Sequence, residues 1–447
     1  FGNCPNLEKL DVSGFNTSQV TSMARMFDGC LSLSEINVSE FDTGSVTTMA
    51  RMFGNCKAVA NLNVAKWNVS NVTDMYDLFF ACTSLKGVSI NKWNTSNVIN
   101  MSGMFSNCKA LTDIDFLRGL NVSSVTNMSG MFASCDGLKK VDDLSFLDTS
   151  NVINMSGLFR KCAALTYIDI SGLNTSKVTD MSYMFDACSS LKDIEFGNFD
   201  TSQVTNLYGL VARCELLESL DMSEWDLRKL EEGCVFCWEA QAICQRSCSG
   251  IQEIHTPKNL NIPNGSMDFP ITAKNEVWFD ETGNVYPLHA GIPENIAESL
   301  ILKKGLKMEP PVADVRGGNY SEAKTVSLTT SEEGADIYYT IDGSKPSREN
   351  GILYTGPISI SEAVELQAIA SKSGRPNSDV MSETYSFAIS KETVNMDDLE
   401  LGEDKAGKVE DEITQVFPAD YELELALVPV KASCEVQVDG TYKVKVS

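Results

Sequence analysis

Apolar residues recur through the first half of the chain with a period of 26 or 27 residues. Nine cysteines mark this period: Cys4, Cys30, Cys56, Cys82, Cys108, Cys135, Cys162, Cys188 and Cys214. In the copy VTNMSGMFASC (residues 125–135), Val, Met, Met, Phe and Cys fall at i, i+3, i+6, i+7 and i+10. That spacing is typical of one apolar face of a short helix.

The period becomes extended after each cysteine. Leu33, Ile36 and Val38 follow Cys30 with the alternation of a short strand, and Asn or Asp with Thr and Ser then indicates a turn. One such unit cannot bury its apolar face alone, whereas stacked copies bury a continuous core. The sequence therefore predicts an α/β leucine-rich-repeat solenoid, with a short helix and a short strand per repeat. Extra residues near Leu120 and Leu147 are expected to bulge a turn.

The run VTDMSYMFDACSSLKDIEF followed by FDTSQVTNL (residues 178–207) resembles the BspA-like bacterial surface proteins, which are built on 26-residue leucine-rich repeats. The resemblance covers roughly residues 1–250. It implies a secreted or surface-anchored protein associated with adhesion and without enzymatic activity. Because Phe1 aligns with Phe27, we expect that further repeats, a signal sequence and an anchor lie outside this chain.

Four domains are predicted. Residues 1–255 form the solenoid, and residues 256–308 resemble the terminal cap of this repeat family, with VWFDETGNVYPL as a hairpin turning at Gly283 and Asn284. Residues 311–390 carry closely spaced strand and turn signals that favour a β-sandwich. Residues 392–447 favour a small β-domain with a hairpin turning at Asp439 and Gly440, and truncation at Ser447 is left open.

The third domain also carries a family resemblance. The segments IYYTIDGSKPS, LYTGPI and LQAIASKSGRPNSDV are similar to the chitobiase/β-hexosaminidase C-terminal domain, an immunoglobulin-like accessory module. That module does not contain the hydrolase active site. The resemblance therefore implies a spacer or a carbohydrate-adjacent module and no glycosidase activity.

Charge and composition narrow the function. Sixty-one acidic against 36 basic residues give a net charge of −25, which disfavours nucleic acid. No apolar run is long enough to span a membrane. Neither His255 nor His289 has a nucleophile motif beside it, and no carboxylate pair stands out, so we expect no enzymatic activity and no cofactor.

The cysteines and neighbouring methionines could in principle bind a metal ion or form disulfides. Met128, Met131 and Cys135 have the spacing of a soft-metal site, but the same face recurs in every copy, so these side chains are expected to pack in ladders. The repeat cysteines are predicted to be free buried thiols, because parallel Cβ directions suit disulfides poorly. A second group has three open interpretations, a degenerate repeat, disulfides or zinc: Cys234, Cys237, Cys244 and Cys248.

Polar positions recur as well. The residue seven positions after each cysteine should point outward from the strand and form an exposed row: Asp11, Asn37, Asn63, Ser89, Asp115, Asp142, Asp169, Glu195 and Asp221. A solvated face is one interpretation, and a binding face for cations such as calcium or for a basic partner is the other. The Asn-x-Ser sequences at Asn16, Asn68, Asn94, Asn121 and Asn174 match glycosylation acceptors, but their recurrence favours a structural turn.

We therefore predict a bacterial cell-surface or secreted, non-enzymatic adhesion protein that binds an extracellular protein or glycan. One alternative is a glycan-binding accessory region of a larger carbohydrate-active surface protein. The other is a structural stalk. The sequence does not name the ligand, because specificity lies in exposed side chains.

Overall fold

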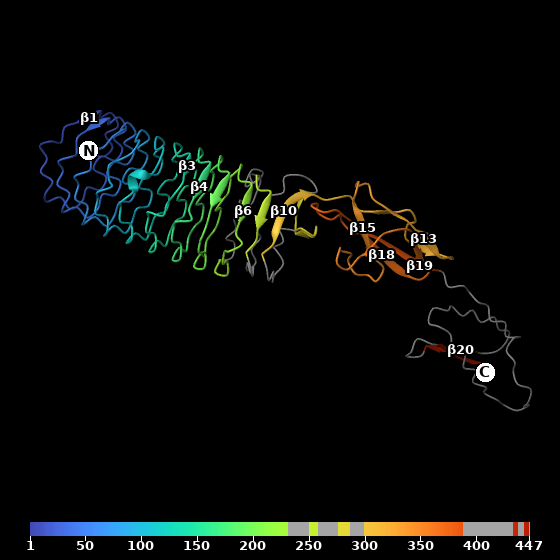
Figure 1. Ribbon diagram of the computed structural model, residues 1–447. Helices are drawn as coiled ribbons and strands as arrows, with labels where there is room; N and C mark the ends of the chain where they lie inside the picture. Colours follow the sequence, from blue (N-terminus) through green and yellow to red (C-terminus); the bar gives the residue numbers. More distant parts are fainter. Residues whose placement is uncertain (231–249, 258–275, 287–298, 388–431, 437–441, 447) are drawn as a thin grey trace, which may run out of the picture. The chain divides into compact units, whose positions relative to one another are not determined.

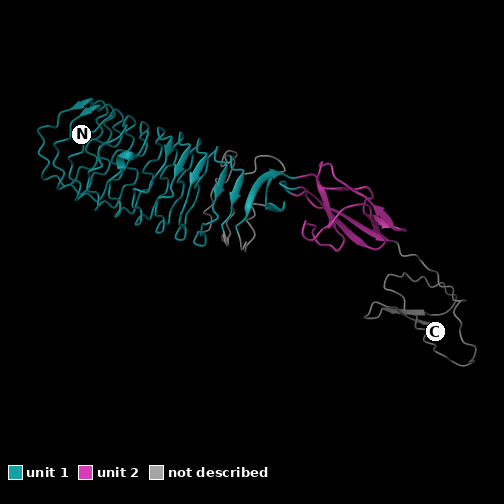
Figure 2. Ribbon diagram, viewed as in Figure 1, with its two compact units in different colours: residues 1–307, 373–376 teal, residues 308–372, 377–447 magenta. Residues whose placement is uncertain are grey.

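The computed structural model describes residues 1–230, 250–257, 276–286, 299–387, 432–436 and 442–446. The chain divides into two compact units (Figure 2). Unit 1 comprises Phe1–Lys307 and Ser373–Pro376, and unit 2 comprises Met308–Lys372 and Asn377–Ser447. The predicted group Cys234, Cys237, Cys244 and Cys248, and also His289, lie outside the described residues.

Unit 1 is built from copies of the repeat that stack on one another (Figure 1); each copy is called a rung below. The backbone amide of Met75 donates to the carbonyl of Asn100 in the next rung at 2.9 Å, and that of Phe79 donates to Met104 at 2.9 Å. A continuous parallel ladder joins the rungs through residues 22, 48, 74, 100, 127, 154, 180 and 206. Successive rungs are therefore held together by their backbones.

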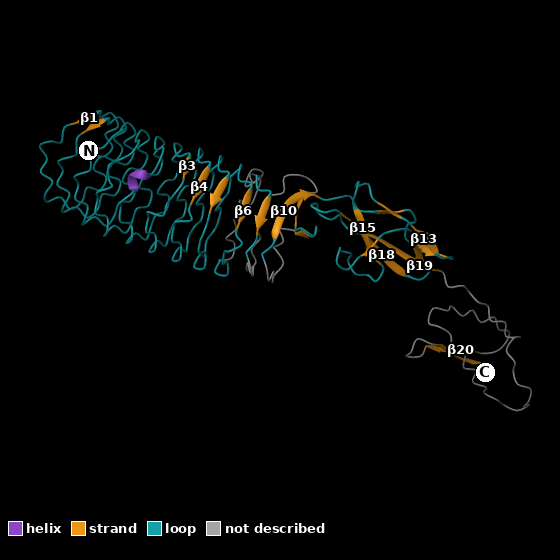
Figure 3. Ribbon diagram, in the orientation of Figure 1, coloured by secondary structure: helices purple, strands orange, loops and turns teal. Residues whose placement is uncertain are grey.

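The helix-plus-strand leucine-rich-repeat solenoid predicted from the spacing is wrong. In the described residues the one helix is the 3-10 helix η1 (Asp115–Leu117), shown in purple in Figure 3. The segments expected to be helical are chains of tight turns, in which Leu78 donates to Met75 three residues back at 3.1 Å. Unit 1 is a stack of short parallel strands and turns.

Left-handed backbone explains why these segments are not helical. One residue with positive φ lies two positions after the first methionine, or after Leu207 in the last of these rungs: Arg25, Arg51, Asp77, Gly103, Gly130, Gly157, Tyr183 and Gly209. A second lies just before the cysteine: Asn3, Gly29, Asn55, Ala81, Asn107, Ser134, Lys161, Ala187 and Arg213. Helical residues need negative φ, so each of these positions interrupts a helix. A left-handed third residue is characteristic of a type II turn.

The core of unit 1 consists of side-chain columns that run through the stack. The buried phenylalanines Phe27, Phe53, Phe79, Phe105, Phe132, Phe159 and Phe185 stack with ring centroids 5.4 to 6.2 Å apart. The repeat cysteines are free, as predicted, and all of them are buried except the exposed Cys4. Each buried thiol donates to a phenylalanine carbonyl of the preceding rung, as Cys108 does to Phe79 at 3.1 Å. Thiols thus help to join the rungs.

Short strands follow six of the nine repeat cysteines, and within the described rungs no strand follows Cys56, Cys82 or Cys108. They are β1 (Lys9–Leu10), β2 (Glu35–Ile36), β3 (Lys140–Val141), β4 (Tyr167–Asp169), β5 (Asp193–Glu195) and β6 (Ser219–Asp221). β1 pairs with β2, and β3, β4 and β5 form a three-stranded sheet; all of these pairings are parallel. The extra residue near Leu120 falls beside η1 and Gly119, whose φ is +98°. The insertion changes a turn and leaves the stack intact.

Unit 1 ends in a mixed five-stranded sheet of order β6-β7-β10-β8-β9. It contains β7 (Glu253–His255), β8 (Glu276–Phe279), β9 (Val285–Tyr286) and β10 (Ile301–Leu306). β7 continues the parallel stacking on β6, with Ile251 and Ile254 buried. β8 and β9 form the predicted hairpin, and Gly283 has a φ of +89° in its turn.

Unit 2 contains the strands predicted across residues 311–390. The strands are β11 (Val312–Ala313), β12 (Gly318–Tyr320), β13 (Lys324–Val326), β14 (Leu328–Thr329), β15 (Asp336–Thr340), β16 (Ile352–Leu353), β17 (Ile358–Ile360), β18 (Val364–Ser371) and β19 (Met381–Phe387). The main sheet has the order β12-β19-β18-β15-β16, and β11 pairs with β14 and β13 with β17. Its core includes Leu366 and Tyr385.

Two further strands, β20 (Ala432–Val436) and β21 (Tyr442–Val446), pair antiparallel as the predicted hairpin requires. The expected turn at Asp439 and Gly440 lies outside the described residues.

A column of buried threonines gives a test of the stacking. Thr175 donates to the carbonyl of Asp200 in the next rung at 2.8 Å, whereas Val69 occupies the equivalent position of its own rung without a donor. Replacing Thr175→Val removes one buried hydrogen bond at nearly constant volume, and we expect a loss of about 1 kcal/mol in the free energy of unfolding. Val69→Thr supplies the missing donor and should raise it. Urea titration measures both, and equal midpoints for the two variants would contradict this reading.

Candidate functional site

The predicted acidic row lies on the surface that carries strands β1 to β7, called the strand face below. Asp11, Asp115, Asp142, Glu195 and Asp221 are exposed, and Asp169 is half-buried. Asp169 lies beside Glu195, in register on β4 and β5. Asp115 belongs to η1, and Asn63 and Ser89 lie in rungs without a strand, so the row is interrupted over these three rungs.

Five of the six carboxylates of this row have local partners. Asp11, Asp169 and Asp221 each accept the backbone amide of the serine two residues later at 2.9 Å. Asp115 pairs with Arg118 at 2.9 Å, and Asp142 pairs with Lys140 at 2.5 Å. Across the described residues, no group of three or more His, Cys, Asp or Glu side chains could hold a metal ion. Several carboxylates of the row therefore help to fix turns.

His255 terminates the row in a small polar network. Its Nε2 lies 2.8 Å from Glu253 and its Nδ1 lies 3.5 Å from Asp221, and Lys303 approaches Glu253 at 3.4 Å. The hydrogen bond with His255 lowers the pKa of Glu253, and Lys303 adds to the effect. The imidazole therefore joins neighbouring strands as a structural side chain of the stack end.

The asparagines of the Asn-x-Ser sequences confirm the structural role expected for them. Asn68 accepts hydrogen bonds from the amide of Ser70 at 3.1 Å and from its hydroxyl at 2.8 Å. The same side-chain turn forms at Asn16, Asn94, Asn121 and Asn174. Each asparagine oxygen fixes the turn between strand and ladder.

Sequence reasoning missed two ionic clusters on the surface formed by the tight turns between methionine and cysteine, called the turn face below. In one of them, Asp186 is completely buried and accepts Arg160 Nε at 2.8 Å and Arg213 Nη2 at 2.5 Å. The guanidinium of Arg160 also lies over the ring of Tyr183, with its carbon 4.7 Å from the centroid. Tyr183 in turn meets Tyr208 edge to face at 5.1 Å.

The second cluster centres on Arg51, which reaches Asp28 at 3.1 Å and Asp77 at 2.7 Å. These bonds, chiefly that with Asp28, raise the pKa of Arg51. Burial raises the pKa of Asp77 against the opposing effect of its hydrogen bonds and of Arg51. Every partner lies in a neighbouring rung, 23 or 26 residues away.

The buried thiols are chemically inert. Burial raises the pKa of Cys56 and of Cys162 to about 12, and raises that of Cys82, Cys108 and Cys188 well above the usual range. A thiol reacts as its thiolate, so these groups stay protonated and unreactive at neutral pH. They do not form a redox or nucleophilic site.

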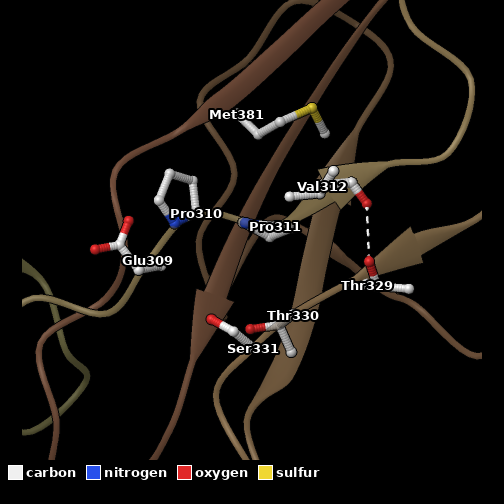
Figure 4. Close-up of a pocket in the computed structure, with 8 residues that line it drawn as sticks. All are labelled: Glu309, Pro310, Pro311, Val312, Thr329, Thr330, Ser331 and Met381. Carbon is white, nitrogen blue, oxygen red and sulfur yellow. Dashed lines mark hydrogen bonds between the residues drawn. The ribbon is translucent and has the colours of Figure 1, made fainter.

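Unit 2 has an open hollow with a volume of about 650 Å³ (Figure 4). Its lining is formed by Glu309, Pro310, Pro311, Val312, Thr329, Thr330, Ser331 and Met381. The figure shows the prolines and Met381 on one side and the hydroxyls of Thr330 and Ser331 on the other. Apolar surface beside hydroxyl groups suits a small neutral ligand.

A stack of strands and turns followed by a separate all-β unit defines a repeat protein with an appended β-module. The chain belongs to the family described as Mycoplasma protein of unknown function, DUF285, which matches residues 1–113, 53–142, 75–167 and 126–249. This agrees with the resemblance to BspA-like surface proteins, although the repeats are not of the leucine-rich-repeat type in structure.

Residues 315–382 match the chitobiase/beta-hexosaminidase C-terminal domain, as the resemblance implied. No curated protein matches the chain. Within the described part, no helix has the length and apolarity needed to cross a membrane. The two family matches indicate a cell-surface or carbohydrate-related protein.

The buried carboxylate of Asp186 gives a stability test. Asp186→Ala leaves two arginines without their shared acceptor, and because these are 40% and 45% exposed, water replaces part of the loss. We expect a loss of about 2 kcal/mol in the free energy of unfolding. The control Glu40→Ala removes another ion pair between rungs, that of Glu40 with Lys66. The side chains of Glu40 and Lys66 are 71% and 67% exposed. Because water screens this pair, the control should lose much less stability than Asp186→Ala in chemical denaturation, and equal losses would contradict the account.

The raised pKa values of the buried thiols predict that the protein loses stability at alkaline pH. The folded chain holds the Cys162 proton up to about pH 12, whereas the unfolded chain releases it near its ordinary pKa of about 8.5. The stabilisation is present below about pH 8.5 and is lost as the pH rises toward 12, by about 1.4 kcal/mol per pH unit for each such thiol. Unfolding titrations at several pH values should show a shallower slope for Cys162→Ala. An unchanged slope would show that this thiol ionises equally in both states.

Proposed function

We propose that this protein is a bacterial cell-surface or secreted binding protein that recognises a host or matrix protein or a glycan and catalyses no reaction. The observation that carries the proposal is that, within each rung, some positions form the buried core and others face outward. The phenylalanine and cysteine columns are buried and nearly constant from rung to rung, with Val211 replacing the last phenylalanine and Cys4 exposed, while the outward positions differ. A repetitive frame with variable exposed side chains suits recognition of an extended ligand.

The chemistry of the described residues supports a non-enzymatic role. The buried thiols remain protonated, and His255 is engaged by Asp221 and Glu253. A nucleophilic site needs an activated thiol or hydroxyl within reach of a base. The family match over the repeats supports a place on the cell surface.

A second function, a glycan-binding accessory region, is favoured by a separate observation. The matched chitobiase-type domain and the hollow beside it lie in unit 2, and the hollow combines prolines and Met381 with threonine and serine hydroxyls. In this alternative, unit 2 contacts sugar and the repeats serve as a spacer.

A glycan array and a panel of host matrix proteins, both probed with the intact chain, test the proposal. We expect saturable binding to at least one glycan or matrix protein and no hydrolysis of chitooligosaccharides. The urea-unfolded chain is the control and should not bind. Binding to none of the probes would support a structural stalk and contradict the proposal, and sugar hydrolysis would contradict its non-enzymatic part.

Variants then separate the surfaces. We assign the binding of basic matrix proteins to the acidic strand face. Combining Glu195→Gln with Asp221→Asn should weaken that binding by at least about threefold. Calcium titration of the same variant tests whether the row holds cations. Met381→Asp places a charge in the hollow of unit 2, and loss of glycan binding by this variant alone would support the accessory function.

A further inference from the structure

The turn face departs from the repeat pattern at the cluster around Asp186. Two positions before the cysteine, the rungs carry small residues at Ala133 and Ala212 but Arg160 in the rung after Ala133. Two positions after the first methionine, Gly157 and Gly209 flank Tyr183. The stack tolerates small residues at these positions, so packing between rungs does not require the arginine or the tyrosine.

Arg160 is held in one orientation, and the terminal nitrogens of its guanidinium are not used within the stack. Its Nε donates to Asp186 at 2.8 Å and its plane covers Tyr183, yet its side chain is 40% exposed. Its Nη1 and Nη2 make no hydrogen bond within the described residues. A fixed guanidinium that presents its terminal N–H groups to solvent matches the two oxygens of a carboxylate or sulfate.

Arg51 in the second cluster provides an internal comparison. Its Nε and Nη2 bond to Asp28 and its Nη1 bonds to Asp77, and its side chain is only 19% exposed. All three nitrogens are therefore used within the stack. Arg51 is a structural arginine, whereas Arg160 retains donors for a ligand.

Charge and shape around Arg160 favour an acidic sugar. Arg160, Lys161 and Arg213 contribute three positive charges against Asp186 and the exposed Glu215. Asp136 in the preceding rung pairs with Lys109 at 3.0 Å, so this segment is net positive in a chain of net charge −25. Lys161 is exposed and has no ion pair among the described residues. The half-buried rings of Tyr183 and Tyr208 provide apolar surface beside the cations, as sugar C–H groups require.

We propose that the turn face around Arg160 binds acidic saccharides, with Arg160 pairing the carboxylate or sulfate group and Tyr183 contacting the sugar ring. This inference rests on the proposed function and names the class of glycan. The guanidinium is prepared by Asp186 and Tyr183, so little side-chain freedom is lost when the ligand binds. The acidic strand face repels the same ligand, which restricts it to the turn face.

Calorimetry with the intact chain at physiological ionic strength tests the proposal. The probes are a heparin-derived hexasaccharide for sulfate, oligogalacturonate for carboxylate, maltohexaose as the uncharged sugar, and polyglutamate as an acidic peptide. We expect binding of at least one acidic saccharide, weaker binding of polyglutamate and none of maltohexaose. Equal or tighter binding of polyglutamate would overturn the sugar assignment.

The repeat itself supplies substitutions that the fold accepts. Arg160→Ala copies Ala133 and Ala212, and Tyr183→Gly copies Gly157 and Gly209. Each should weaken acidic-saccharide binding by about tenfold or more. Arg160→Lys keeps the charge without the paired donors and should recover only part of the affinity. Arg118→Ala removes an arginine of the same charge beside η1 and should leave affinity unchanged.

The outcomes distinguish this inference from the proposed function. If the wild-type chain binds glycans or matrix proteins on the arrays but Arg160→Ala binds acidic saccharides as tightly as the wild type, the inference is wrong and the binding function stands. If the chain binds nothing on the arrays, the proposed function fails as well. Circular dichroism of each variant checks that loss of binding is not loss of folding.

Discussion

Hydrogen bonds between the backbones of successive rungs are the constraint on which the rest of the structure depends. In each rung, alternate amides between methionine and cysteine donate to the next rung, as Met75 and Phe79 do. The left-handed residues between them turn the chain so that this alternation is possible. Because every rung repeats the same path, equivalent side chains point the same way. The phenylalanine stack and the thiol ladder are consequences of that geometry.

The same geometry separates structure from recognition. Inward columns meet an identical neighbour above and below, so their residue types are confined to those that stack. Outward columns meet solvent and can differ, which gives an acidic strand face and a turn face with two arginine clusters. The guanidinium nitrogens of Arg51 all donate within the stack, whereas the terminal nitrogens of Arg160 remain available to a ligand. An acidic strand face and the arginine cluster around Arg160 can therefore coexist on one repeated frame.

Much of this arrangement could be predicted from the sequence. The period, the buried columns, the free thiols and the asparagine turns follow from residue types that recur in one chain. The turns could not be predicted, because Val, Met, Phe and Cys at that spacing suit a helix face and a stack of turns equally well. Residue types such as Lys161 and Arg213 also give no sign that their φ is positive. The Asp186 cluster was missed because its partners are a whole rung apart. Its signal was the replacement of alanine and glycine by arginine and tyrosine.

Far-ultraviolet circular dichroism of the intact chain tests the central claim most directly. Stacked strands and turns joined by backbone bonds between rungs should give a spectrum without the double minimum of α-helix. A helix between methionine and cysteine in every rung would instead make that double minimum prominent. A strong helical signal that disappears with unfolding of the repeats would contradict the account.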